Sequence, residues 1–229
     1  MRKDIEKYIG LSIIAVFIFT FLYKQKFHVS LPYGRVFYKL GMECEGKCPV
    51  DRQIKYFQKS IYYDPNLSPS YYQLAVLYEK KGEYQIALDF YKVVTRLDHT
   101  HNTAYFKVGL DYFQGGELEY ALRCFLQAFK HKDRYHELHK AVFYFYLGRV
   151  YELRKDYWAA IKFYWGSVEG GYKEVSGLIK IGMLYYHLGD KAMALKQIEQ
   201  LRGLHEDQAA DRLEQYIEEG SGLETMMDE

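Results

Sequence analysis

Residues 71–98 read YYQLAVLYEKKGEYQIALDFYKVVTRLD, and they contain two segments with helical periodicity. A tight break at Lys81-Gly82-Glu83 separates the two segments, since glycine readily adopts the positive φ that ends many helices. The arrangement recurs along the chain: Leu40-Gly41, Leu74-Ala75 and Val108-Gly109 follow one another every 34 residues. A fixed period in this range is typical of a helical solenoid, in which each helix pair buries its apolar face against the next.

Other positions keep the same phase over five units. The Leu–small pair continues at Leu147-Gly148 and Ile181-Gly182, after one insertion of five residues. An aromatic or apolar residue precedes each pair by three, at Phe37, Tyr71, Tyr105, Tyr144 and Leu178. Each second segment carries a small or polar residue, at Gln53, Ala87, Ala121, Ala160 and Ala194. Four residues later an aromatic or Ile follows, at Phe57, Tyr91, Phe125, Tyr164 and Ile198.

This pattern of aromatic, Leu, Gly or Ala, and then Ala and aromatic resembles the tetratricopeptide repeat family. The resemblance implies an all-α, right-handed solenoid of about five helix pairs over residues 34–203. The expected units are 34–67, 68–101, 102–140, 141–174 and 175–203. Residues 207–219 are amphipathic and are expected to form a capping helix, followed by a polar tail over 220–229. The insertion between the third and fourth units favours a longer first helix in unit four.

Residues 9–23, IGLSIIAVFIFTFLY, contain no charged side chain. We interpret them as a single transmembrane anchor, between a polar start at 1–8 and a linker at 24–33. A helix of this length covers roughly 22 Å, so snorkelling of Lys7 and Lys24 would be needed for it to span the bilayer. The alternatives are a cleaved signal peptide, which lacks a small-residue cleavage site here, and a buried core helix. The flanking charges slightly favour an array on the extracytoplasmic, periplasmic side.

The charge balance and the motifs restrict the function classes. The formal net charge of +1 gives no basic excess for nucleic acid, so we expect no nucleic-acid partner. No phosphate-binding loop, zinc-protease motif or nucleophile elbow occurs, and we predict neither enzymatic activity nor a cofactor. His131, His136 and His139 suggest a metal site, and His136 and His139 would share a helix face. No cysteine or third ligand at a diagnostic spacing accompanies them, so we predict a solvated polar connection there and no metal site.

Three cysteines cannot pair completely, which excludes a disulfide framework. Cys44 and Cys48 lie at the end of one predicted helix and in its turn. Their spacing leaves three interpretations open: a small core residue with an incidental thiol, a disulfide that closes the turn, or a two-ligand metal site. The disulfide requires an oxidising compartment.

In tetratricopeptide arrays the first helix of each pair lines the concave groove, and this resemblance implies the partner site. The expected groove residues are Tyr38, Met42, Tyr72, Val76, Glu79, Phe106, Leu110, Phe113, Phe145, Arg149, Glu152, Ile179, Met183 and Tyr186. The charged clamp with which some family members hold acidic chaperone tails is absent, because Tyr38, Met42 and Val76 occupy its slots. Several of these side chains have an equally good interpretation as packing between helices.

A groove of aromatic residues and methionine suits a protein partner with an apolar segment or an amphipathic helix. The leading hypothesis is therefore a membrane-anchored scaffold, held in the lipid bilayer through residues 9–23, that recruits protein partners to assemble or localise a complex. The alternative is a chaperone-like holder that binds apolar segments of unfolded or exported proteins. Self-association through the Tyr-rich convex surface is compatible with both.

Overall fold

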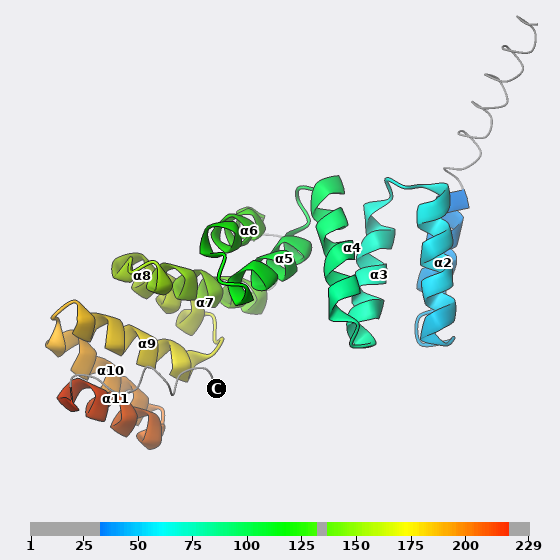
Figure 1. The fold of residues 1–229 in the computed structure, drawn as a ribbon. Helices are drawn as coiled ribbons and strands as arrows, with labels where there is room; N and C mark the ends of the chain where they lie inside the picture. Colours follow the sequence, from blue (N-terminus) through cyan, green and yellow to red (C-terminus); the bar gives the residue numbers. More distant parts are fainter. Residues whose placement is uncertain (1–32, 132–136, 220–229) are drawn as a thin grey trace, which may run out of the picture. The chain divides into compact units, whose positions relative to one another are not determined.

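The computed structural model describes residues 33–131 and 137–219, and these are helical except for turns and short connections (Figure 1). No strand occurs within these two ranges. The chain divides into two compact units: an N-terminal unit that ends at Asp98 and a C-terminal unit that begins at His99. The prediction of an all-α chain built from helix pairs is confirmed for the described residues.

The N-terminal unit contains two helix pairs. Residues 33–43 are helical and pair with α2 (Val50–Tyr63), and α3 (Ser68–Lys80) pairs with α4 (Tyr84–Leu97). The C-terminal unit contains α5 (Asn102–Gln114) with α6 (Leu118–Lys130), α7 (Glu137–Leu153) with α8 (Tyr157–Glu169), and α9 (Glu174–His187) with α10 (Lys191–Gly203). A last helix, α11 (Asp207–Glu219), packs against α9 and α10. We refer to the two members of each pair as its first and second helix.

Three of the five pairs, the first, third and fourth, are closed by an aromatic ring of the second helix that lies against a glycine of the first. A Cβ built on Gly41 would meet the Phe57 ring at 2.7 Å, and one on Gly109 would meet the Phe125 ring at 2.7 Å. The Tyr164 ring lies equally close to Gly148, at 2.8 Å. These three rings are completely buried. The small residues of the repeat pattern are therefore required because no side chain fits between the helices.

The turns follow from local sequence. Gly82, Gly116 and Gly189 lie two residues after the end of a first helix and have φ of 77°, 76° and 81°, values that glycine adopts without the steric cost of a Cβ. The fourth pair uses Lys155 at φ 61° in the same place. Side-chain caps begin some second helices: Asp190 accepts a hydrogen bond from the amide of Met193 at 3.0 Å.

The insertion lengthens a first helix, as expected: α7 has 17 residues whereas α5 has 13. The residues that precede α7, 132–136, lie outside the described part of the chain, and with them His136. In the first pair, Gln53 occupies the slot that alanine fills in the other second helices, and polar contacts accompany the packing of Phe57 on Gly41. Gln53 is buried and donates to the carbonyl of Gly41 at 3.1 Å, and the Ser60 hydroxyl lies 2.7 Å from the carbonyl of Gly34.

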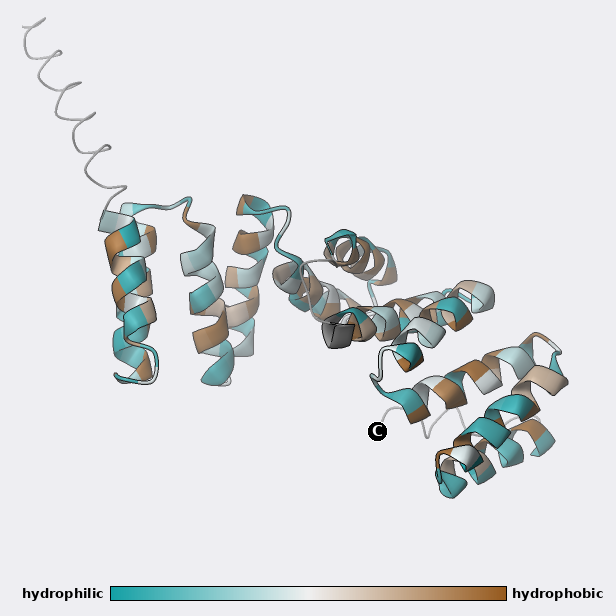
Figure 2. Ribbon diagram, turned by 180° about the vertical axis from the view of Figure 1, so that it is seen from behind, coloured by the Kyte–Doolittle hydropathy of each residue, from teal (hydrophilic) through white to brown (hydrophobic). Residues whose placement is uncertain are grey.

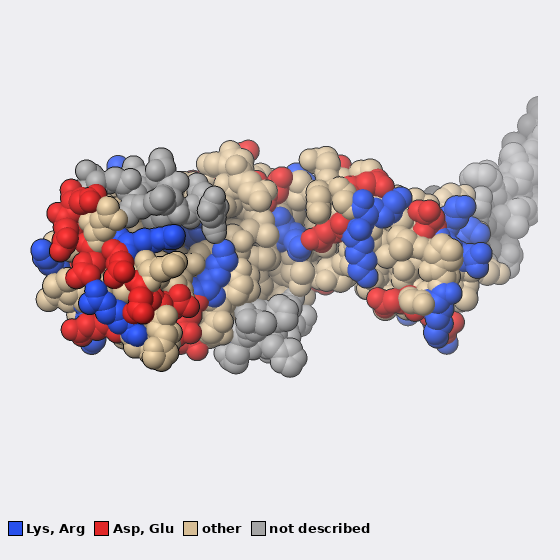
Figure 3. All heavy atoms as spheres, turned by 90° about the horizontal axis from the view of Figure 1, so that it is seen from below, with Lys and Arg blue, Asp and Glu red and all other residues tan. Residues whose placement is uncertain are grey.

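Apolar residues lie on the helix faces that turn towards neighbouring helices, as the hydropathy colours show (Figure 2). The helix α11 buries Leu213, Tyr216 and Ile217, whereas Asp211 and Arg212 on its other side are exposed. Aspartate and glutamate side chains gather over this end of the C-terminal unit (Figure 3). The predicted capping helix thus presents a polar outer face.

The prediction of a single-pass membrane protein with its array on the extracytoplasmic side is wrong on the evidence of the structure. Within residues 33–131 and 137–219 no helix is both long enough and apolar enough to cross a bilayer. The described helices of the array have 11 to 17 residues, with apolar and polar faces, whereas a membrane span requires roughly 20 apolar residues. Residues 9–23, on which the prediction rested, lie outside the described residues.

The turn of the first pair contains a disulfide between Cys44 and Cys48, whose Cα atoms are 5.4 Å apart. Cys44 is buried, so the bond fastens the end of the helix over 33–43 to the exposed turn. The third cysteine, Cys124, is a free thiol in α6. Burial raises the pKa of the Cys124 thiol, which reduces its thiolate fraction near neutral pH.

Replacing Gly148 with alanine is expected to destabilise the C-terminal unit, because the added methyl group overlaps the Tyr164 ring. The expected cost is about 1–3 kcal/mol, which corresponds to several degrees in melting temperature. The matched control is Gly203→Ala at the end of α10, where nothing lies within 4 Å of the added carbon. Thermal unfolding followed by circular dichroism measures both. Equal melting of the two variants would contradict the close packing at Gly148.

Alkylation tests the disulfide. In denaturant without a reductant, iodoacetamide is expected to modify one cysteine, Cys124, whereas prior reduction exposes three. Reduction is expected to lower the free energy of unfolding by about 2 kcal/mol, because the closed loop is short. Peptide mass spectrometry identifies the modified residues. Three modified cysteines without reduction, in protein taken from its native compartment, would show that the bond does not form there.

Candidate functional site

The predicted groove residues all lie on first helices, but they divide between the two units. Tyr38, Met42, Tyr72, Val76 and Glu79 belong to the N-terminal unit, and the others belong to the C-terminal unit. Phe145 and Met183 are buried, and the remaining residues of the set are half-buried. We refer to the half-buried members in the C-terminal unit as the first-helix face: Phe106, Leu110, Phe113, Arg149, Glu152, Ile179 and Tyr186.

One groove slot recurs in all five first helices, and we refer to its residues as the ladder: Tyr38, Tyr72, Phe106, Phe145 and Ile179. The aromatic members of the ladder pack on the second helices. Tyr72 lies with its ring centroid 6.0 Å from that of Tyr91. The centroids of Phe106 and Phe125 are 5.6 Å apart, as are those of Phe145 and Tyr164. Each ladder residue therefore has a structural contact, and only its exposed part is available to a partner. One part of each ladder side chain packs against the second helix, and the exposed part is the one that a partner could contact.

Two groove glutamates have a second role as acceptors for buried tyrosine hydroxyls. The Tyr91 hydroxyl donates to Glu79 at 2.8 Å, and the Tyr164 hydroxyl donates to Glu152. Burial first, and then the adjacent glutamate, raises the pKa of Tyr91 and of Tyr164. A phenol in a closely packed site requires such an acceptor, because an unpaired buried hydroxyl is costly.

In the third pair, apolar residues replace both the tyrosine and the glutamate. Its second helix carries Phe125, which has no hydroxyl, and the slot of the glutamate is occupied by Phe113. The guanidinium of Arg149 lies over the Phe113 ring, 5.1 Å from its centroid. A cation at this distance from an aromatic face is attracted by the ring quadrupole. Arg149 is thus placed on the first-helix face by the neighbouring pair.

Glu152 also connects two pairs. The Lys180 ammonium in α9 lies 3.0 Å from the Glu152 carboxylate in α7, and both side chains are mostly shielded from solvent. Arg149 is close enough to act electrostatically on Tyr164. The first-helix face therefore has a charged centre, formed by Arg149, Glu152 and Lys180, between apolar side chains. The sequence analysis did not select Lys180, although it stands directly after Ile179.

Tyr146 is a second residue that the sequence analysis missed. Its ring centroid lies 5.4 Å from that of Phe106, 5.9 Å from that of Phe125 and 5.9 Å from that of Phe145. It therefore joins the third and fourth pairs beneath the first-helix face. Its neighbour Phe145 occupies the ladder slot, and the repeat pattern alone does not distinguish the two aromatics.

Among the residues that the structure describes, no group of three or more His, Cys, Asp or Glu side chains could hold a metal ion. The side chains on the first-helix face combine apolar area with one ion pair and one arginine. Such a surface is suited to holding a polypeptide segment by apolar burial and a few directional polar contacts.

Comparison with known proteins agrees with this architecture. The family model described as tetratricopeptide repeat matches residues 56–89. A crystal structure of MamA protein has a TM-score of 0.58 at 22% identity and covers 83% of this chain and 97% of that chain. YrrB, described as a TPR protein with an unusual peptide-binding site, has a TM-score of 0.62 at 15% identity and covers 81% and 92%. PilF of Pseudomonas aeruginosa has a TM-score of 0.53 at 14% identity and covers 85% and 95%.

No curated protein matches the chain significantly. The similarity to the solved structures lies below 25% identity, so it concerns the fold. The family model marks residues 56–89 as a tetratricopeptide repeat, and the solved structures share the fold of stacked helix pairs with this chain.

Alkaline unfolding tests the buried Tyr164–Glu152 contact. Because the pKa of Tyr164 is raised in the folded chain, the unfolded chain loses this proton first as the pH rises past the usual value of about 10. The stabilisation is complete below that pH and decreases above it. We expect Tyr164→Phe to reduce the loss of stability between pH 9 and pH 11, measured by urea unfolding. The control is Tyr84→Phe at an exposed tyrosine. An unchanged pH slope in Tyr164→Phe would contradict the assignment.

Proposed function

We propose that this tetratricopeptide repeat protein is a scaffold that binds a protein partner through the first-helix face of its C-terminal unit. The face binds an apolar or amphipathic segment of the partner. Through this binding the array assembles or localises a protein complex. Any catalysis then belongs to the partner. The observation that carries the proposal is the set of half-buried apolar side chains that helix packing leaves partly accessible on α5 and α9, with the charged side chains of α7 between them.

The accessible parts of Phe106, Leu110 and Ile179 come from α5 and α9, on either side of α7. They supply the apolar area that a partner segment would cover, at about 25 cal/mol for each Å² buried. Arg149 and Glu152 in α7 lie between them and fix the register of the segment through polar contacts. A surface of this composition favours an apolar partner over a strongly charged one.

The fold supports this proposal because tetratricopeptide arrays generally bind other proteins. The YrrB structure is described as having a peptide-binding site, which is a property of that protein. For the present chain the first-helix face supplies the corresponding chemistry. A holder of unfolded clients would use the same apolar side chains, but it would not require the fixed charged centre at Glu152.

Binding is tested with Leu110→Glu, which places a charge in the apolar part of the face. The matched control is Leu126→Glu in α6, an exposed leucine of the same helix pair. Crosslinking of the full chain in its native cell, followed by mass spectrometry, identifies captured proteins. We expect Leu110→Glu to lose a defined partner that Leu126→Glu retains, while both keep the wild-type circular dichroism spectrum.

The affinity for that partner is expected to fall by about tenfold or more, which corresponds to 1.4 kcal/mol of lost burial. Equal capture by the two variants would place the binding surface elsewhere. Suppression of aggregation of unrelated denatured proteins, without a saturable partner, would favour the holder instead.

A further inference from the structure

The first helix of the array leaves open a surface that later pairs of the array bury. The slot of the repeat leucine is 0% exposed at Leu74, Leu147 and Ile181, but Leu40 in the helix over 33–43 is 37% exposed. Four residues earlier, Ser70 and Phe143 are 0% and 4% exposed, whereas Val36 is 50% exposed. The same repeat position thus changes from core to surface at the start of the described chain.

The structure also shows what covers this face in later pairs. Leu74 and Leu77 of α3 pack in one cluster with Ile54 and Phe57 of the preceding α2. The equivalent face of α7 packs against Leu122 and Phe125 of α6. In each case the cover is a helix with an aliphatic residue followed by an aromatic residue three positions later. Among the described residues, no helix precedes 33–43 to supply this cover.

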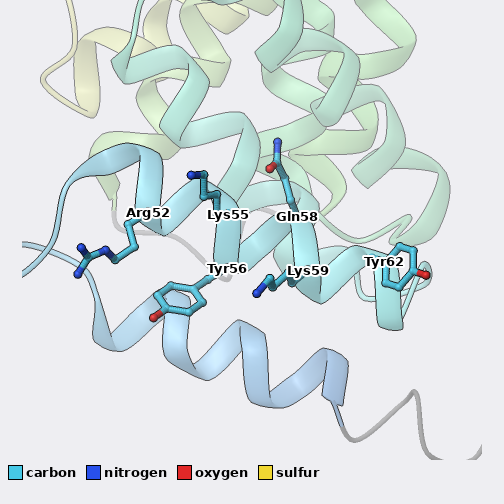
Figure 4. A pocket seen from close by; sticks show the side chains of 6 residues that line it. All are labelled: Arg52, Lys55, Tyr56, Gln58, Lys59 and Tyr62. Carbon is cyan, nitrogen blue, oxygen red and sulfur yellow. The ribbon is translucent and has the colours of Figure 1, made fainter.

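Positive charge surrounds the open face. Arg35 and Lys39 are exposed on the helix over 33–43. The adjacent α2 forms a shallow hollow of about 520 Å³ lined by Arg52, Lys55, Tyr56, Gln58, Lys59 and Tyr62 (Figure 4). The Lys59 ammonium lies 5.2 Å from the ring centroid of Phe37, which connects the hollow to the first helix.

The nearby carboxylates offset this positive charge only at Lys39, which pairs with Glu43, because Asp51 pairs with Lys81 instead. Asp51 at the start of α2 lies 3.3 Å from Lys81, and Glu43 lies 3.8 Å from Lys39. No carboxylate lines the hollow. A helix that covers this face therefore needs an apolar stripe to bury Val36 and Leu40. It also needs negative charge, because positive charge opposite these cations would be repelled.

We propose that the open face, defined by Val36, Leu40 and the cationic hollow of α2, binds an acidic amphipathic helix of a partner protein. The helix would lie where a preceding second helix lies in later pairs. It would present an aliphatic residue and an aromatic residue spaced by three, as Ile54 and Phe57 are, with Asp or Glu on its flank. This site is separate from the first-helix face of the C-terminal unit.

A second copy of the chain is a poorer occupant. Two open faces brought together would place Arg35, Lys39 and Lys55 of each copy near one another, at a cost in electrostatic energy. At the other end of the described chain, α11 has an acidic outer face, but it exposes no large apolar side chain. The outer face of α11 could therefore supply negative charge to the open face, but it offers no apolar side chain to cover Leu40.

The test uses a fluorescein-labelled peptide with the sequence of residues 207–219, DQAADRLEQYIEE, which carries Leu213 and Tyr216 at the required spacing. Its binding to the full chain is followed by fluorescence anisotropy. The variants are Leu40→Ser and the double change Lys55→Glu/Lys59→Glu. The control is Tyr84→Ser, an exposed aromatic on α4 of the same unit. A peptide with Asn and Gln in place of Asp and Glu isolates the charge.

We expect saturable binding that weakens about tenfold in Leu40→Ser and in Lys55→Glu/Lys59→Glu, and is unchanged in Tyr84→Ser. The neutral peptide is expected to bind more weakly, and added salt to reduce the difference. Leu110→Glu should not affect this binding, which separates the result from that of the proposed function. Unaltered circular dichroism spectra exclude a loss of fold.

Three outcomes would overturn the proposal. The first is an absence of peptide binding, or binding that Leu40→Ser leaves unchanged. The second is a wild-type dimer in sedimentation that Leu40→Ser converts to a monomer, because the occupant would then be a second copy. The third is Leu40-dependent binding to phosphatidylglycerol vesicles without binding to the peptide, which would identify a lipid surface.

Discussion

The contact between a buried aromatic ring and a glycine on the facing helix is the constraint on which three of the helix pairs depend. Phe57, Phe125 and Tyr164 each occupy the space that a Cβ at Gly41, Gly109 or Gly148 would fill. The ring holds the two helices at a distance set by its own thickness, and it buries one of the largest apolar surfaces in the pair. The first helix of the following pair then packs against the same second helix. The one contact therefore positions both the helix pair and the pair that follows it.

This constraint also decides the polar chemistry of the first helices. Where the ring is a tyrosine, its hydroxyl lies in a site that water does not fill, and the first helix supplies Glu79 or Glu152 as the acceptor. Where the ring is Phe125, the same slot carries Phe113, and Arg149 of the next pair lies over that ring. A partner can therefore contact only those parts of the first-helix side chains that do not pack against the second helix.

Much of this could be predicted from the sequence because the repeat positions are tied to short-range geometry. The period of 34 residues, the glycine slots and the turn glycines report contacts within one pair, and the structure confirms them at Gly148 and Gly82. The membrane prediction rested on composition alone, and no helix in residues 33–131 or 137–219 supports it. The partner site was harder to predict, because the same repeat slot carries a phenylalanine both where it is buried, as at Phe145, and where it is half-buried, as at Phe106.

By itself the sequence determined that the chain folds into helix pairs, where each pair turns, and which small residues allow the helices to approach. These features depend on neighbours three or four positions away within a helix and, across a pair, on neighbours such as Gly148 and Tyr164 that are close along the chain. Only the tertiary structure decided that Glu152 bonds to both Tyr164 and Lys180, and that Leu40 is exposed where Leu74 is buried. Burial is a property of what lies across a helix interface, so residues in the same repeat slot can differ in exposure.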